Sequence, residues 1–138
     1  MSPGNTTSGQ VLESMILPAL QKGGYTTKTQ VHIGSRFNGG KHFADAVAEK
    51  GDRRILLSVK WQQVSGTAEQ KVPYEVMCLA HAVDEQKFDK AYLVLGGEGW
   101  TLREFFTGGG LSKHLVNHDK ATIITLEAFI ALANKGKL

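Results

Sequence analysis

Two stretches rich in apolar and β-branched residues, 42–48 and 54–61, stand on either side of a short polar segment, and this arrangement constrains the fold more than any other feature. Each stretch alternates in the manner of a β-strand, with successive side chains on opposite faces. The polar segment between them contains Gly51-Asp52, which suits a two-residue hairpin turn. The sequence therefore predicts an antiparallel hairpin.

The register of this hairpin decides which polar side chains meet. With a two-residue turn, Asp45 falls opposite Ser58 and diagonal to Lys60, on one side of the sheet. Strict alternation also places Asp45 on the face of Phe43 and Val47, an unusual setting for an unpaired carboxylate. A register slip of one residue would separate the polar groups.

Helices and further strands surround the hairpin. The expected elements are a helix over 9–22, strands over 26–33, 42–48 and 54–61, a helix from Thr67 towards Val83, strands over 91–95 and 121–125, and a closing helix over 126–134. Pro18 predicts a kink or an early end of the first helix. Thr67 and Gln70 have the spacing of a capping box. This order predicts an α/β fold, with a central mixed sheet of four or five strands flanked by helices.

Length and composition limit the organisation of the chain. At 138 residues it has the size of one domain, which we place at 9–138 after a flexible tail over 1–8. No apolar run approaches the ~18 residues of a membrane span, and the lone Cys78 lies in an apolar run typical of a buried core thiol. We expect a cytoplasmic protein without a membrane partner. The net charge of +3 is compatible with a polyanionic partner but does not establish one.

The element order and these polar positions resemble the PD-(D/E)xK nuclease superfamily. The restriction-endonuclease-like core of that family is a helix, a three-strand meander, a crossing helix and a further strand, and the resemblance covers about 9–125. In the family, the second core strand supplies an Asp, and the third supplies Glu or Asp, one residue, then Lys. Asp45 and Ser58-Val59-Lys60 stand at those positions, Glu13 matches a glutamate of the first helix, and Gln62 matches a common extension of the motif.

The resemblance implies a metal-dependent endonuclease that hydrolyses DNA phosphodiester bonds with Mg²⁺, for which Mn²⁺ substitutes. Asp45, Glu13 and the carbonyl of Val59 would hold the ion. Lys60 would orient the attacking water and stabilise developing charge, and Gln62 would support the site through hydrogen bonds.

Ser58 departs from the family motif, because a neutral hydroxyl is a poor ligand for a hard cation. In an active protein, another acid fills the gap, as in restriction enzymes of this superfamily that read Ser-Val-Lys and take a glutamate from the next helix. Glu69 and Glu75 are the candidates here. In an inactive protein, the site would have lost its metal and would keep only a nucleic-acid surface.

Structural roles would also account for these residues. Asp45 and Lys60 could form a cross-strand ion pair. Glu13 could be a solvated helix residue, and Glu69 could stabilise the first turn of its helix through the dipole alone.

The loop before the second strand offers cations beside the proposed site. Arg36, Lys41 and His42 are candidates for contacts with DNA phosphates, although an ordinary hairpin connection explains the loop nearly as well. The rival functions are a catalytically inactive DNA-binding or assembly module and a small enzyme or scaffold with a non-nucleic substrate. The last predicts no salt-dependent DNA binding. A subunit with one site would need pairing, as a homodimer, to cut both DNA strands together.

Overall fold

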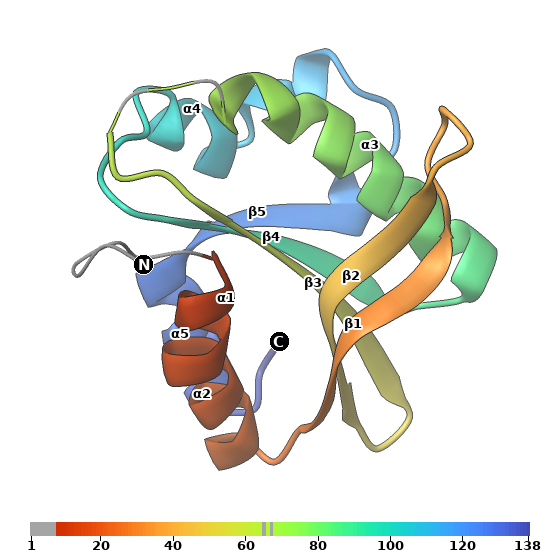
Figure 1. Cartoon of the computed structure of the whole chain (residues 1–138), viewed down its shortest axis with the longest axis vertical. Coiled ribbons are helices and arrows are strands. Elements are labelled where there is room, and N and C mark those ends of the chain that lie inside the picture. The colour runs from red at the N-terminus through yellow and green to blue at the C-terminus, as the bar shows by residue number, and fades with distance from the viewer. Residues whose placement is uncertain (1–7, 65, 67) are drawn as a thin grey trace.

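The computed structural model describes residues 8–64, 66 and 68–138, and its centre is a five-stranded mixed sheet in the order β1-β2-β3-β4-β5 (Figure 1). The strands are β1 (Thr26–Ser35), β2 (Lys41–Lys50), β3 (Arg53–Trp61), β4 (Lys90–Gly96) and β5 (Ala121–Thr125). The first three form an antiparallel meander, and β4 and β5 run parallel to β3. The predicted α/β class and mixed sheet are confirmed.

Helices cover both faces of this sheet (Figure 1). They are α1 (Ser8–Val11), the π-helical turn η1 (Leu12–Ile16), α2 (Leu17–Lys22), α3 (Ala68–Gln86), α4 (Arg103–Thr107), the 3-10 turns η2 (Gly110–Lys113) and η3 (His118–Lys120), and α5 (Leu126–Asn134). The segments α1, α2 and α5 lie on one side, and α3 and α4 lie on the other. Most of the predicted tail and the Thr67 capping residue fall outside the described residues. None of the helices in the described part of the chain combines the length and apolar content needed to cross a bilayer.

The N-terminal helical segment runs through Pro18 without a break. Proline lacks an N–H and crowds the carbonyl four residues earlier, which would be that of Ser14. The preceding turn relaxes into π-helical geometry, in which the Leu17 N–H donates to the Leu12 carbonyl. The predicted kink is thus replaced by one wider turn.

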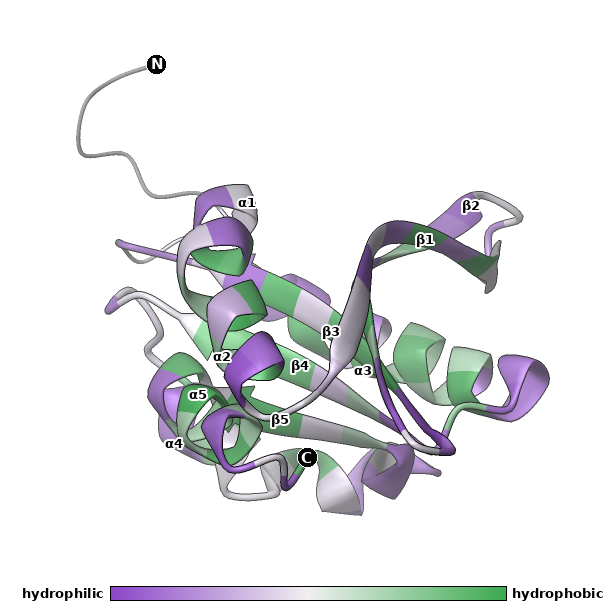
Figure 2. Ribbon diagram, turned by 90° about the horizontal axis from the view of Figure 1, so that it is seen from below, coloured by the Kyte–Doolittle hydropathy of each residue, from purple (hydrophilic) through white to green (hydrophobic). Residues whose placement is uncertain are grey.

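Two apolar cores lie on the two faces of the sheet. One joins the N-terminal helical segment and α5 to the sheet through residues such as Leu20, Leu57 and Phe129. The other packs α3 against the sheet, for example through Leu79 and Leu93. Figure 2 shows hydrophobic residues along β4 and β5 and hydrophilic residues at the outer end of α3. Cys78 is buried as a free thiol on α3, as predicted.

The β2–β3 turn has the predicted length. Lys50 pairs with Arg53, so Gly51 and Asp52 form a two-residue turn. Gly51 adopts a left-handed φ of 59°, which glycine reaches without a steric penalty. This turn fixes the register on which the position of Asp45 depends.

The predicted strict alternation along β2 is wrong at Asp45. Ala44 and Val47 both belong to the core beneath α3, whereas Ala46 belongs to the opposite core. Ala44 and Val47 are three residues apart and face the same core, whereas strict alternation would place them on opposite faces. On β1, the residue opposite Asp45 is Gln30, which has a left-handed φ of 52°. The backbone is therefore irregular where Asp45 lies, and this local irregularity leaves no simple periodic signal in the sequence.

Candidate functional site

Asp45 lies where β2 and β3 separate. Their cross-strand register extends from the turn to the pair of Ala46 with Leu57. Beyond that pair, Oδ2 of Asp45 accepts a hydrogen bond from the backbone N–H of Val59, with an N···O distance of 2.6 Å. The carboxylate thus takes the place of a cross-strand carbonyl and is held between the two strands.

Glu75 on α3 supplies a second carboxylate to this region. Its side chain is buried, and Oε2 lies 3.8 Å from Nζ of Lys60 and 3.3 Å from Nη1 of Arg36. Oε1 lies 3.4 Å from Nε2 of His42. One carboxylate from α3 therefore meets side chains from the β1–β2 loop, from β2 and from β3. We call Asp45, Lys60 and Glu75 the acidic-lysine cluster.

The two carboxylates of the cluster have opposite pKa shifts. Burial raises the pKa of Asp45, and the negative charge of Glu75 adds to this effect, against the opposing influence of the Val59 N–H and Lys60. Burial also pushes the pKa of Glu75 upwards, but the contact with His42 and the charges of Lys60 and Arg36 outweigh it and lower that pKa. Asp45 is therefore the group that carries an incompletely compensated charge.

The donors of the cluster suit one kind of cation site. Asp45 and Glu75 offer hard carboxylate oxygens, and Mg²⁺ is commonly bound by one or two carboxylates together with waters and substrate phosphates. Among the described residues, no group of three or more histidine, cysteine, aspartate and glutamate side chains surrounds one point. The donor set therefore fits a cation that keeps water and phosphate ligands, and it does not fit a closed protein cage.

Glu69, the other candidate acid, is held elsewhere. Its Oε1 accepts hydrogen bonds from the backbone N–H of Thr101 at 2.6 Å and from the Thr101 hydroxyl at 2.9 Å, and its Oε2 accepts the N–H of Leu102 at 3.0 Å. Although burial acts to raise the pKa of Glu69, these hydrogen bonds lower it below its ordinary value. Glu69 thus fastens the segment before α4 to α3, and Glu75 alone of the two lies beside Lys60.

The Gln62 side chain connects the start of α3 to the segment that follows β4. Its Oε1 accepts the backbone N–H of Ala68, in the first turn of α3, at 3.1 Å, and its Nε2 donates to the carbonyl of Gly99 at 2.7 Å. Nε2 also lies 3.4 Å from the Glu69 carboxylate. A Cβ on Gly97 would collide with the Gln62 backbone, so the two segments pack in direct contact. All the described contacts of the Gln62 side chain are to this junction, and none is to Asp45 or Lys60, contrary to the expected hydrogen-bond support of the catalytic residues.

The remaining predicted site residues differ in how exposed their side chains are to solvent. Glu13 is exposed on η1, and the described residues give its carboxylate no hydrogen bond or ion pair. Lys41 is exposed at the start of β2, and the Arg36 side chain is partly exposed. His42 is only 2% exposed and faces Glu75, which argues against the predicted phosphate contact. Sequence reasoning could not identify His42 as a partner of Glu75, because the sequence alone does not show that α3 brings Glu75 to β2.

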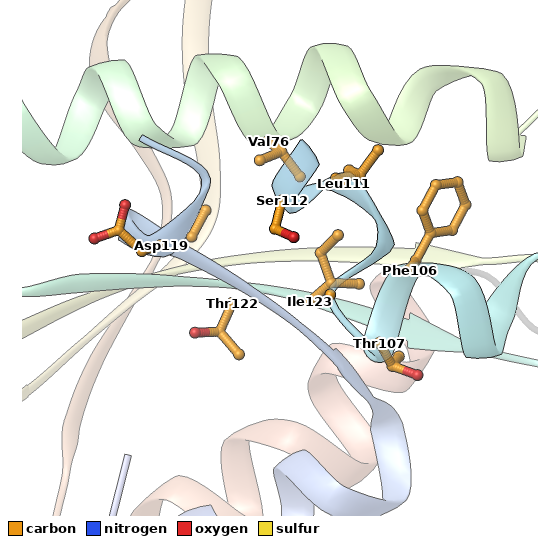
Figure 3. Close-up of a pocket in the computed structure, with 10 residues that line it drawn as sticks. Val76, Phe106, Thr107, Leu111, Ser112, Asp119, Thr122 and Ile123 are labelled. Carbon is orange, nitrogen blue, oxygen red and sulfur yellow. The ribbon is translucent and has the colours of Figure 1, made fainter. Parts of the chain in front are cut away.

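A separate hollow of about 180 Å³ lies between α3, β5, α4 and η2 (Figure 3). Val76, Phe106 and Ile123 give it apolar walls, and Thr107, Ser112, Asp119 and Thr122 lie around it. None of the predicted site residues lines it. The hollow is therefore distinct from the acidic-lysine cluster.

Comparison with known proteins gives a family match over nearly the whole chain. A family model described as a PD-(D/E)XK nuclease superfamily domain matches residues 4–137. The chain belongs to the PD-(D/E)XK nuclease superfamily. The predicted resemblance is confirmed, and membership supports a nuclease-like function.

A solved structure shares the fold of this superfamily member. The crystal structure of a protein of unknown function, AF1548, superposes with a TM-score of 0.51 at 16% sequence identity. The match covers 80% of this chain and 54% of that one, so this chain spans about half the length of the protein it matches. The likeness supports the restriction-endonuclease-like core. No curated protein matches the chain.

Proposed function

We propose that the chain is a metal-dependent endonuclease that hydrolyses DNA phosphodiester bonds at the acidic-lysine cluster. The observation that carries this proposal is the approach of Glu75 to Lys60, with an O···N distance of 3.8 Å. Ser58 leaves the family motif one carboxylate short, and Glu75 brings a carboxylate to the same region from the following helix. An acid that arrives from a different element preserves the donor chemistry despite the altered motif.

The residues proposed to hold Mg²⁺, or Mn²⁺ in its place, are Asp45, Glu75 and the carbonyl of Val59. When bound, the cation would grip a non-bridging phosphate oxygen and make a coordinated water more acidic. The raised pKa of Asp45 supports this assignment, because a cation would compensate a carboxylate charge that burial and Glu75 disfavour. Glu13 is kept as a candidate metal ligand only because it matches the glutamate that the family often has in its first helix.

Lys60 would orient the attacking water and stabilise the negative charge that develops on the phosphoryl oxygens. The water oxygen forms a new bond to phosphorus as the bond to one ester oxygen breaks. The water gives up a proton to solvent or to a nearby base, and the departing oxygen gains one from solvent or from a nearby acid. The ammonium group of Lys60 is partly exposed, so a phosphate can reach it from outside.

Incubation of supercoiled plasmid with the protein and Mg²⁺ or Mn²⁺ tests this function. Nicked or linear DNA should accumulate, EDTA should prevent it, and Lys60→Ala should abolish it while the protein stays folded. Lys113→Ala is the matched control, because Lys113 is an exposed lysine on η2 and should be dispensable. Undiminished cutting by Lys60→Ala would exclude the proposed role of Lys60.

A catalytically inactive DNA-binding or assembly module is the second candidate, and one observation favours it. Glu75 already has Arg36, His42 and Lys60 as partners, so its charge is balanced by the protein itself. A module of this kind would bind DNA in a salt-dependent manner and leave plasmid intact at every Mn²⁺ concentration.

A further inference from the structure

Exposed aromatic side chains lie beside the acidic-lysine cluster. Phe37, in the β1–β2 loop, is 55% exposed, and Tyr74, on α3, is 39% exposed. The ring centroid of Phe37 lies 5.1 Å from that of His81 and 6.3 Å from that of Tyr74. We call these three rings the aromatic platform. Large aromatic side chains gain little by facing water, so their grouping at one exposed place calls for a ligand with a flat apolar face.

The platform is fixed next to the proposed catalytic residues. Phe37 follows Arg36, and Tyr74 precedes Glu75 in the chain. The Arg36–Glu75 ion pair, at 3.3 Å, holds the β1–β2 loop against α3. A DNA strand with a phosphate at the acidic-lysine cluster would therefore have its adjoining nucleotides close to the platform.

A hollow of about 190 Å³ adjoins the platform. It is lined by Phe37, Met77, Ala80, His81, Asp84, Val116 and Asn117. Its lining combines apolar and aromatic side chains with the polar groups of His81, Asp84 and Asn117. Asp84 would repel a phosphate if its charge were unpaired, but Lys120 forms an ion pair with it. The wall can accept a base without a net charge opposing the strand.

Charge on the hairpin favours a polyanion. The sequence between Glu13 and Asp45 contains no aspartate or glutamate, so the exposed Lys41 at the hairpin tip has no acid beside it in the hairpin, whereas Arg36 is paired with Glu75 of α3. A cationic tip with an aromatic surface matches the two chemical parts of a nucleic-acid strand, which are the phosphates and the bases.

We propose that the aromatic platform stacks an unpaired base of the DNA substrate, and that the chain therefore prefers single-stranded or locally unpaired DNA to continuous duplex. This inference rests on the proposed function, since it assigns a substrate preference to that site. In duplex DNA the faces of a base are covered by its neighbours, whereas an unpaired base presents a free face for stacking. An exposed aromatic platform suits such a base.

Binding measured without cleavage tests the proposal. The full chain, in EDTA, is titrated into a labelled single-stranded DNA oligonucleotide or into a duplex of the same sequence, and fluorescence anisotropy is recorded. The wild type should bind the single strand more tightly. Phe37→Leu, which keeps an apolar side chain but loses the ring, should weaken single-strand binding about 5- to 150-fold and leave duplex binding unchanged. Phe37→Trp should restore binding.

Stacking has a spectroscopic signature that a structural role would not produce. A 2-aminopurine in the single strand should lose fluorescence on binding to the wild type and retain it with Phe37→Leu. The salt dependence should have the same slope in both proteins, because phosphate contacts are unaffected. Phe105→Ala is the matched control, since Phe105 is 44% exposed on α4, away from the hairpin, and it should bind as the wild type does.

Equal binding of single strand by Phe37→Leu and the wild type would overturn the proposal. A change from dimer to monomer in Phe37→Leu, measured by sedimentation, would also overturn it, because the platform would then be a contact between copies of the chain. The proposed function fails separately: a wild type that quenches 2-aminopurine but never cuts with Mn²⁺ retains the platform and loses the nuclease assignment.

Discussion

The ammonium group of Lys60 on β3 lies 3.8 Å from the buried carboxylate of Glu75 on α3. The contact crosses from the sheet to the helix that covers it, so it depends on the packing of α3 rather than on the local motif. It places an acid beside the lysine although the sequence has Ser58 at the usual acidic position.

Asp45→Asn should stabilise the metal-free protein at neutral pH. The folded-state pKa of Asp45 is raised, mainly by burial, so folding favours the protonated carboxyl and the ionised form costs stability above that pKa. Asparagine removes the charge and can still accept the Val59 N–H. The difference in the free energy of unfolding should disappear below about pH 4, where the carboxyl is protonated in both states. Urea unfolding in EDTA at several pH values measures it, and an Asp45→Asn protein less stable at neutral pH would contradict this account.

Glu75→Gln should destabilise the protein at neutral pH, which is the opposite of the effect expected for Asp45→Asn. Despite burial, contacts with His42, Lys60 and Arg36 lower the folded-state pKa of Glu75, so ionised Glu75 adds stability that is present above its unfolded-state pKa and is lost as pH falls through the folded-state value. The substitution should cost about 1–3 kcal/mol at neutral pH, because buried His42 loses its charged partner. The same urea series checks it. A cost that stayed constant down to the acid limit would show that the charge of Glu75 is not involved.

Mn²⁺ should raise the melting temperature of the wild type. A ligand that binds only the folded state stabilises it by about 2.7 kcal/mol at a concentration 100 times its dissociation constant. Asp45→Asn should lose this shift, whereas Asp52→Asn should keep it, because Asp52 is exposed in the β2–β3 turn. Thermal unfolding with and without Mn²⁺ gives the readout, and an equal shift in all three proteins would place the ion elsewhere.

Gln62→Ala should lower the stability of the fold rather than abolish cleavage. Its amide joins the first turn of α3 to Gly99, and its loss leaves buried groups without partners, at a cost of about 1–3 kcal/mol. The folded variant should still cut DNA at low temperature. Urea unfolding and plasmid cleavage separate the two effects. Lost cleavage with unchanged stability would instead support the catalytic role first expected for Gln62.

The sequence predicted the elements whose signals are local. The turn at Gly51-Asp52, the strand over 121–125 and the closing helix over 126–134 follow from turn chemistry and apolar periodicity, and the structure confirms them. The π-helical turn before Pro18 and the broken alternation at Asp45 are backbone adjustments that periodicity does not encode. For the same reason, the sequence placed Asp45 near Lys60 but gave the wrong alternation around it.

The partners of the site residues depend on tertiary packing. Glu69 and Glu75 both lie in the first half of α3, and only the orientation of that helix separates a loop anchor from a partner of Lys60. His42 looked like a loop cation and is instead buried against Glu75. The sequence therefore yielded the family and the candidate set, while the division of roles among the candidates required the structure.

Plasmid cleavage by Glu75→Gln and by the double variant Ser58→Asp with Glu75→Gln tests the central claim most directly. If Glu75 supplies the carboxylate that the motif lacks, Glu75→Gln should lose at least about 100-fold in cleavage rate, comparable to removal of one charge-stabilising group, and the added aspartate should recover part of it. If Glu75→Gln cleaved plasmid at the wild-type rate at the same Mn²⁺ concentration, the claim would be contradicted.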